Sequence, residues 1–259
     1  VLFRSLEGLS RYQLNQQLLN TLIEEQDVSA MFRRFRAAGE LPYGAFGELV
    51  WETQRLEMQA LAERVMAERQ QAQSMEIDLQ CGGVNLTGWL QQVQPDGLLR
   101  WRPSLLSVSQ GMQLWLEHLV YCASGGTGES RLFVRKEGEG RFPALAPAEA
   151  QAYLNELVDG YLLGMSQPLL LLPESGGAWL KACYDAEKDV ILMDEETQQK
   201  ARSKFLQTYE GNMVVSGEGA DIWYQRLWRS LEPAHYEEII AQTQRYLLPL
   251  YRYHRSTQI

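Results

Sequence analysis

Residues 1–72 place their apolar side chains at the spacing of α-helices. One stripe recurs every three or four positions and predicts an amphipathic helix; its members are Leu14, Leu18, Leu19, Leu22 and Ile23. A second, short helix is expected over residues 28–38, with Asp27 as its N-terminal cap and Gly39 at its end. A long helix should then run from Phe46 to Gln70 with four apolar side chains directed inward, namely Leu49, Val50, Leu61 and Val65.

The spacing of the apolar residues changes in the middle of the chain. Apolar and polar side chains alternate there as in β-strands, and the strands expected cover residues 76–79, 84–93 and 98–101. A Pro-Asp-Gly turn at residues 95–97 joins the last two, so the segment predicts a meander of antiparallel strands. A helix is expected over residues 108–123, and another strand over residues 131–136.

Helical patterns return beyond Pro147. The expected helices cover residues 149–163, 178–184, 195–209, 222–229 and 235–246. The order of helix, three strands, helix and strand predicts an α+β fold in which a mixed sheet lies between helices. We expect three parts: an N-terminal helical segment at residues 1–72, an α/β core at 73–145, and a C-terminal helical segment at 146–259 that packs on the core.

The composition is that of a packed protein with an acidic surface. Of the 259 residues, 45% are hydrophobic and seven are tryptophan, so the chain can bury a substantial core. The formal net charge of −9 argues against strong binding of nucleic acid by the whole surface, because such binding requires a dense positive face. A local basic strip is compatible with this total.

Two groups of residues are candidates for contact with other molecules. Basic side chains on neighbouring predicted strands, with Trp101 among them, form a candidate DNA-phosphate surface: Arg100, Arg102, Arg131, Arg135 and Lys136. The alternative is edge-strand charge that blocks unwanted sheet pairing. Near the chain end, residues 245–253 combine a proline with large apolar side chains and predict a tail that docks on its own domain or on a partner. Its candidate contact residues are Tyr246, Leu250, Tyr251 and Tyr253.

No metal or cofactor site is indicated. The three cysteines, Cys81, Cys122 and Cys183, lie far apart without a nearby histidine, which predicts buried thiols in a reducing compartment. The longest purely apolar run, residues 169–172, is too short to span a bilayer. Residues 1–4 contain neither an initiator Met nor a signal-peptide pattern. We expect a cytoplasmic protein without membrane contact, cut from a longer chain.

The segment LTGWLQQVQPDGLLRWR, residues 86–102, read with GMQLWLEHLVY, residues 111–121, resembles the PD-(D/E)XK nucleases of the RecB type. Active members of that family carry G-x-x-D on the second strand, D-Y-K on the third strand and Q-L-x-x-Y on the next helix. The resemblance implies a restriction-endonuclease-like core, with additional helices on either side of it in this chain.

The residues that carry the chemistry of that family are replaced here. Gly88 is kept, but Gln91 stands at the following Asp position, and Arg100-Trp101-Arg102 stands in place of D-Y-K. On the helix, Gln113-Leu114 is followed by Glu117 where the family has Tyr. An amide cannot replace an anionic ligand of Mg²⁺, and a guanidinium repels the ion. We therefore expect no catalytic residues in this domain, with Gln91, Arg100 and Arg102 as its degenerate positions.

Longer phrases throughout the chain resemble the C-terminal part of the RecC family, the gamma subunits of bacterial exodeoxyribonuclease V (RecBCD). They include RYQLNQQLL at residues 11–19, RWRPSLLSV at 100–108 and LLLLPESGGAWLKACYDA at 169–186. The resemblance implies a non-catalytic, nuclease-like scaffold in double-strand-break repair and recombination. It also implies RecB-like and RecD-like partner subunits, and a double-stranded DNA end or fork within the complex.

Two other functions stay open on the sequence. A divergent metal-dependent nuclease would use Glu76, Asp78 or Asp96, although Asp96 suits the geometry of its Pro-Asp-Gly turn. A pure protein-interaction module would make no contact with DNA, and its binding would be insensitive to charge reversal at Arg100 and Arg102.

Overall fold

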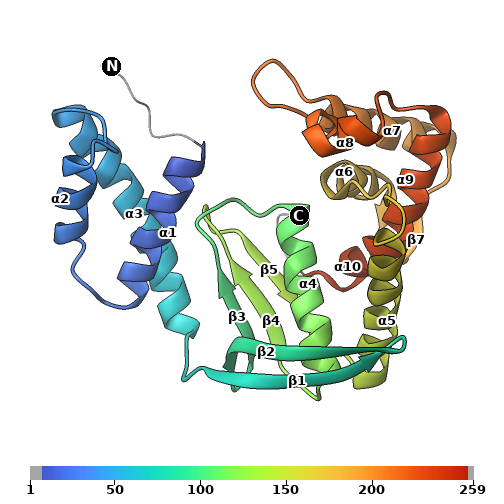
Figure 1. The fold of residues 1–259 in the computed structure, drawn as a ribbon, viewed down its shortest axis with the longest axis horizontal. Helices are drawn as coiled ribbons and strands as arrows, with labels where there is room; N and C mark the ends of the chain where they lie inside the picture. Colours follow the sequence, from blue (N-terminus) through green and yellow to red (C-terminus); the bar gives the residue numbers. More distant parts are fainter. Residues whose placement is uncertain (1–7, 256–259) are drawn as a thin grey trace.

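A computed structural model describes residues 8–255, so residues 1–4 lie outside the described part. Figure 1 shows N-terminal helices, a central sheet and C-terminal helices side by side. The N-terminal helices are α1 (Gly8–Ile23), α2 (Ser29–Ala37) and α3 (Ala45–Glu68). Within residues 8–255, no helix has the length and apolarity needed to cross a membrane.

The first apolar stripe is confirmed, because its residues form the core between α1 and α3. Leu14 and Leu18 are fully buried, and they share a cluster with Met58 and Val65 of α3. The inward prediction for Leu49 was wrong, since 62% of that residue is exposed. Helix α3 carries apolar side chains on two sides, and only the side with Met58 and Val65 is covered.

The predicted mixed sheet is confirmed, but it has five strands rather than the four expected. The strands are β1 (Gln73–Cys81), β2 (Val84–Gln94), β3 (Gly97–Trp101), β4 (Glu129–Phe133) and β5 (Glu139–Phe142), in that spatial order. β3 and β4 are parallel and the other neighbours are antiparallel. The parallel pair is joined by the crossover helix α4 (Val108–Ala123), in agreement with the rule that parallel strands need a long connection.

Each face of the sheet packs against different helices. Leu98 of β3 and Leu132 of β4 pack against α4 in one cluster. Leu99 and Phe133, one position further along each strand, belong to the cluster of α1 and α3. This alternation follows from the two-residue period of strands, and it also decides which way each polar side chain of β3 and β4 points.

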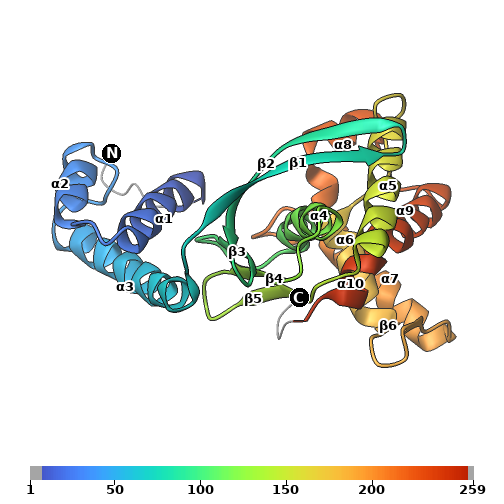
Figure 2. The same cartoon turned by 90° about the horizontal axis from the view of Figure 1, so that it is seen from below.

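The β1–β2 hairpin projects beyond the rest of the sheet and lies across the core toward helix α5 (Pro147–Gly164) (Figure 2). There Gln151 of α5 donates a hydrogen bond to the Gln80 carbonyl (3.0 Å). At its other end β2 turns into β3 at Gly97, where a Cβ atom would lie 1.7 Å from the carbonyl oxygen of Glu129. Glycine is therefore required for β4 to approach this turn.

The C-terminal part surrounds a third cluster that includes Trp179 and Phe205. Its elements are α6 (Pro173–Cys183), the β6–β7 hairpin (Tyr184–Asp185 and Val190–Ile191), α7 (Glu195–Glu210), a 3-10 turn (Glu218–Ala220), α8 (Ile222–Leu227), α9 (Pro233–Tyr246) and α10 (Leu248–Tyr253). Helix α5 instead packs on the sheet core through Ala150 and Leu154, so packing does not divide the chain at residue 146.

Several elements differ from the sequence expectations. The strand predicted over residues 131–136 ends at Phe133, and β5, a polar run of only four residues, follows it. Helix α10 was not expected. Helix α6 begins at Pro173 rather than at residue 178, and Gly176 and Gly177 lie inside it.

Candidate functional site

Arg100 of β3, which the sequence resemblance predicted to be a degenerate position, forms an ion pair with Glu117 of α4. The Nε–Oε2 distance is 2.5 Å, and both side chains are largely buried. The guanidinium also donates from Nη1 to the backbone carbonyl of Leu99 (3.0 Å). The Arg100 side chain is thus held in place by a carboxylate from the neighbouring helix.

Gln91 does not share this environment. Its side chain is exposed and accepts a hydrogen bond from Ser74 Oγ of β1 (2.6 Å). Gln92 has a positive φ of 56°, and β2 pairs with β3 only at Val93 and Gln94. The hairpin therefore leaves β3 just before the point where Gln91 would face Arg100.

A pocket of about 250 Å³ lies beside Arg100 and is the candidate site. Its walls come from α1, β3, α4 and β4, and its lining residues are Gln16, Arg100, Trp101, Arg102, Gln110, Gln113, Leu114, Glu117 and Leu132. Arg102 donates from Nη2 to Gln113 Oε1 (2.5 Å), and Trp101 Nε1 is 3.5 Å from Asn20 Oδ1 of α1. We call this the β3–α4 pocket.

The predicted basic strip does not form one surface. In the parallel pairing, Arg131 lies beside Leu99 and Leu132 lies beside Arg100, so Arg131 and Arg100 point to opposite faces. Arg131 and Arg135 turn instead toward α3, where they form ion pairs with Glu68 (2.9 Å) and Glu57 (3.1 Å). The prediction of a single strip was wrong because successive side chains of a strand point to opposite faces of the sheet. The register of β3 and β4 therefore decides which arginines share a face.

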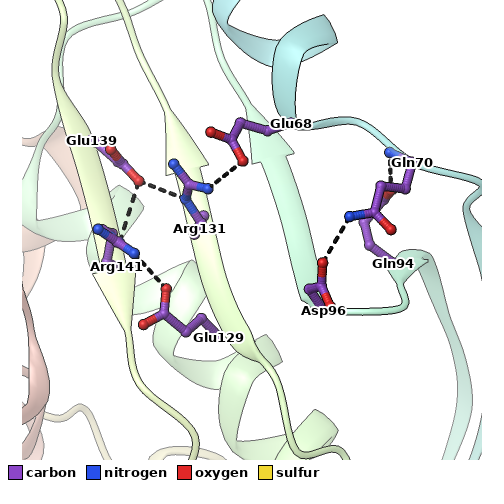
Figure 3. Close-up of polar contacts among 8 residues, drawn as sticks. All are labelled: Glu68, Gln70, Gln94, Asp96, Glu129, Arg131, Glu139 and Arg141. Carbon is purple, nitrogen blue, oxygen red and sulfur yellow. Dashed lines mark hydrogen bonds and ion pairs between the residues drawn. The ribbon is translucent and has the colours of Figure 1, made fainter.

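On the α3 side, carboxylates surround the arginines of β4 and β5 (Figure 3). Arg131 also pairs with Glu139 (2.7 Å), and Arg141 of β5 pairs with Glu129 (2.6 Å). Desolvation tends to lower the pKa of Arg131, but its two carboxylate partners outweigh it, so the pKa is raised. Lys136 is exposed in the turn after β4. These ion pairs leave little net positive potential on this face.

The acids considered for a divergent nuclease lie apart from the β3–α4 pocket. Glu76 and Asp78 are exposed on β1, where they are paired in register with Trp89 and Thr87 of β2. Asp96 accepts a hydrogen bond from Gln70 (2.7 Å; Figure 3). Among residues 8–255, no group of three or more His, Cys, Asp or Glu residues is placed to hold a metal ion.

The C-terminal tail docks on its own domain. Tyr246 and Leu250 are buried, and Leu250 belongs to the sheet core. Tyr251 donates to the Gly177 carbonyl (3.1 Å), and Tyr253 donates to Glu149. The expectation of a partner-docking surface at Tyr246 and Leu250 is therefore corrected: the chain itself covers these side chains, and Tyr251 and Tyr253 are only half-buried.

The histidine and cysteine side chains in the interior are not accessible to solvent. All three cysteines are buried, and desolvation raises the pKa of Cys183 to about 11. His118 is fully buried with Nδ1 2.8 Å from Ser130 Oγ, and burial lowers its pKa to about 4. A neutral His118 ring and a protonated Cys183 thiol follow from this environment.

Sequence reasoning did not identify Glu117 as part of the site, although it noted the departure from Tyr. The signal was its position one helical turn after Gln113, which places both side chains on the same face of α4. Only the structure shows that this face is the one directed at Arg100 and Arg102.

The sequence of the chain matches a known protein family. Residues 4–184, more than half of the chain, match the family described as the RecC C-terminal domain, and the chain therefore belongs to that family. It is similar to the RecBCD enzyme subunit RecC of Escherichia coli (strain K12), with 71% identity over 251 residues, or 97% of this chain and 22% of that protein.

More distant relatives carry the same description. The RecBCD enzyme subunit RecC of Buchnera aphidicola subsp. Acyrthosiphon pisum (strain APS) is 31% identical over 93% of this chain. That of Buchnera aphidicola subsp. Schizaphis graminum (strain Sg) is 28% identical over 95% of it. The chain spans about a fifth of the length of these relatives, with values of 22% and 23%.

Proposed function

We propose that this chain is a non-catalytic, nuclease-like scaffold domain of a RecBCD-type helicase–nuclease that acts in double-strand-break repair and recombination. It docks RecB-like and RecD-like subunits and guides DNA at the fork. Membership in a family whose relatives are named as RecBCD subunits supports the assembly role. The non-catalytic role rests on one observation, the Arg100–Glu117 ion pair.

That ion pair has a direct chemical consequence. Cleavage of a phosphodiester in the nuclease family requires an acid-bound metal ion that activates water. Here a guanidinium occupies the strand position of the acid, and Glu117, the nearby carboxylate, is already neutralised by it at 2.5 Å. A divalent cation would have to displace a positive charge that is covalently part of the strand, so water activation at this position is disfavoured.

The nuclease assay tests the non-catalytic role. The purified chain should not degrade end-labelled single- or double-stranded DNA in Mg²⁺ or Mn²⁺ above a metal-free control. Cleavage that follows the protein peak and is lost in the double variant Glu76→Ala/Asp78→Ala would instead establish the divergent nuclease. Glu187→Ala, an exposed acid elsewhere, is the matched control variant.

Assembly tests the scaffold role. A full-length RecC-type protein that carries this domain should co-purify with RecB-type and RecD-type subunits, and deletion of the domain should abolish or weaken that association. Association without any binding of a forked duplex, unchanged by Arg100→Glu and Arg102→Glu, would favour the pure interaction module.

A further inference from the structure

We infer that the β3–α4 pocket binds a backbone phosphate of single-stranded DNA through Arg102 and Arg100, and that Glu117 limits the affinity by competing for Arg100. This inference rests on the proposed function, because it assigns a strand and a regulator to the DNA-guiding part of that role. It requires no chemistry at the bound phosphate.

Some guanidinium N–H groups in the pocket are available to bind a ligand. Arg102 uses Nη2 for Gln113, and the hydrogen bonds within residues 8–255 leave its Nε and Nη1 without a protein acceptor. Arg100 uses Nε for Glu117 and Nη1 for backbone carbonyls, so Nη2 is likewise left over. Both guanidinium groups line the same space of about 250 Å³. Guanidinium donors are suited to phosphate oxygens, which accept several such bonds at once.

The local charge differs from that of the other basic positions. Two arginines and one carboxylate line the pocket, which leaves a net charge of about +1 if the lining side chains hold their usual charges. On the α3 face, by contrast, Arg131 alone is shared between two carboxylates, Glu68 and Glu139. The β3–α4 pocket is therefore the place where the basic residues of the sheet retain attraction for an anion.

Glu117 sets the strength of this attraction. Its carboxylate is 2.5 Å from Arg100 Nε and lines the same pocket, so a phosphate that approaches Arg100 must compete with a fixed anion and be repelled by it. Replacement of the carboxylate by an amide of the same shape removes the repulsion and leaves the hydrogen bond. The affinity for a phosphate should then rise by roughly three- to tenfold.

The pocket favours a single strand over a duplex. It is recessed between α1 and α4, since Gln16 of α1 and Gln113 of α4 both line it. A single strand can bend its backbone into such a space, whereas a duplex is stiff over about 150 base pairs and presents its phosphates on a convex surface.

The test measures binding of a fluorescein-labelled oligothymidylate of about 16 nucleotides to the purified chain by fluorescence anisotropy, over a series of salt concentrations. Arg102→Ala should weaken binding and reduce the slope of log K against log salt by about 0.7, the value for one phosphate contact with a single strand. Lys136→Ala is the matched control: it removes one exposed positive charge from the other side of the sheet and should change neither quantity.

Glu117→Gln should tighten binding three- to tenfold, and Glu117→Asp, which keeps the charge, should not. Circular dichroism checks that each variant is folded. If Glu117→Gln does not fold, the inference is tested by the slope of log K against log salt for Arg102→Ala. Equal losses in Arg102→Ala and Lys136→Ala, or no gain in a folded Glu117→Gln, would overturn the inference.

Two further ligands identify the source of the phosphate. A duplex of the same length that binds as tightly as the single strand contradicts the single-strand assignment, and so does thymidine monophosphate that competes at equal concentration. Subunit assembly and the absence of cleavage are measured separately, so the scaffold role stands or falls independently of this pocket.

Discussion

His118 lies in the sheet core with its ring stacked on Trp115 and Phe142, at centroid distances of 5.8 and 5.6 Å. Burial lowers its pKa from 6.5 to about 4, and burial lowers the pKa of His254 to about 4 as well. Both rings are therefore neutral in the folded protein near pH 5, where an unfolded chain would protonate them.

The stability of the protein should fall as the pH falls from 6.5 toward 4. In that window the unfolded state binds protons that the folded state excludes, and this favours unfolding. For His118 the loss amounts to about 3 kcal/mol at the acidic end. Urea unfolding at a series of pH values should show a slope of nearly two protons for the wild type and nearly one for His118→Gln. An unchanged slope in the variant would contradict the assignment.

At this scale the sequence revealed losses more readily than gains. The expectation that Gln91 and Arg100 bind no Mg²⁺ follows from residue types alone, because neither an amide nor a guanidinium replaces an anionic ligand of that ion. The partner of Arg100 could not be inferred, since pairing with Glu117 depends on how α4 is rotated against β3. Likewise, no pattern indicated that Gln91 would bind Ser74 rather than face Arg100.

At the scale of elements, helices α9 and α4 approach helix α6 closely. A Cβ atom at Gly176 would lie 2.3 Å from Thr243 Oγ1 of α9, and one at Gly177 would lie 2.5 Å from Val108 Cγ2 of α4. The two glycines therefore let three helices meet closely. Periodicity along one segment cannot show this, and the sequence predicted a helix that begins only at residue 178.

Gly176→Ala should destabilise the protein by about 1–3 kcal/mol, because the new methyl group overpacks the contact with Thr243. Denaturant unfolding gives the free energy of unfolding. Gly88→Ala is the matched control, since no atom lies within 4 Å of the position of its Cβ. Equal effects at the two positions would show that the close approach of α9 is not what requires the glycine.

Two carboxylates bind the starts of two helices in succession. Glu218 accepts hydrogen bonds from the backbone of Glu174 (3.1 Å) and Ser175 (2.7 Å) in the first turn of α6. Glu174 in turn accepts from the backbone of Val108 (3.3 Å) and Ser109 (3.0 Å) at the start of α4. The C-terminal part is thus joined to the crossover helix of the sheet through N-terminal backbone groups that helices leave unsatisfied.

Glu174→Ala should lower the free energy of unfolding by about 1 kcal/mol, because α4 loses acceptors and a favourable charge at its N-terminus. Glu238→Ala, an exposed acid on α9, should have little effect. Thermal unfolding of the two variants side by side measures the difference. If the two melt alike, the capping role of Glu174 is not significant.

At the scale of the whole molecule, residues 8–255 form three hydrophobic clusters, and helix α10 closes the central one. Leu250 of α10 is fully buried in the sheet core, among residues that are distant from it in the sequence. The amino-acid pattern of residues 245–253 correctly indicated a docking segment. It could not distinguish the chain's own core from a partner, because both present the same apolar surface.

Leu250→Ala should reduce the free energy of unfolding by about 2–5 kcal/mol, the usual range for a cavity left by a buried leucine. Leu227→Ala provides the contrast, because 56% of Leu227 is exposed. Chemical denaturation followed by tryptophan fluorescence reports on the core directly through Trp115, which lies in the same cluster. A small effect at Leu250 would mean that α10 does not support the core.

The pair of contacts between β3 and α4 has a consequence for the ionic requirements of the protein. Arg100 binds Glu117 and Arg102 binds Gln113, so a two-residue step on the strand matches a one-turn step on the helix. Both contacts join side chains of the polypeptide directly, so they need no dissociable ion as a bridge. The folded protein should therefore keep its melting temperature in chelators, with strand and helix held together at any concentration of divalent cations.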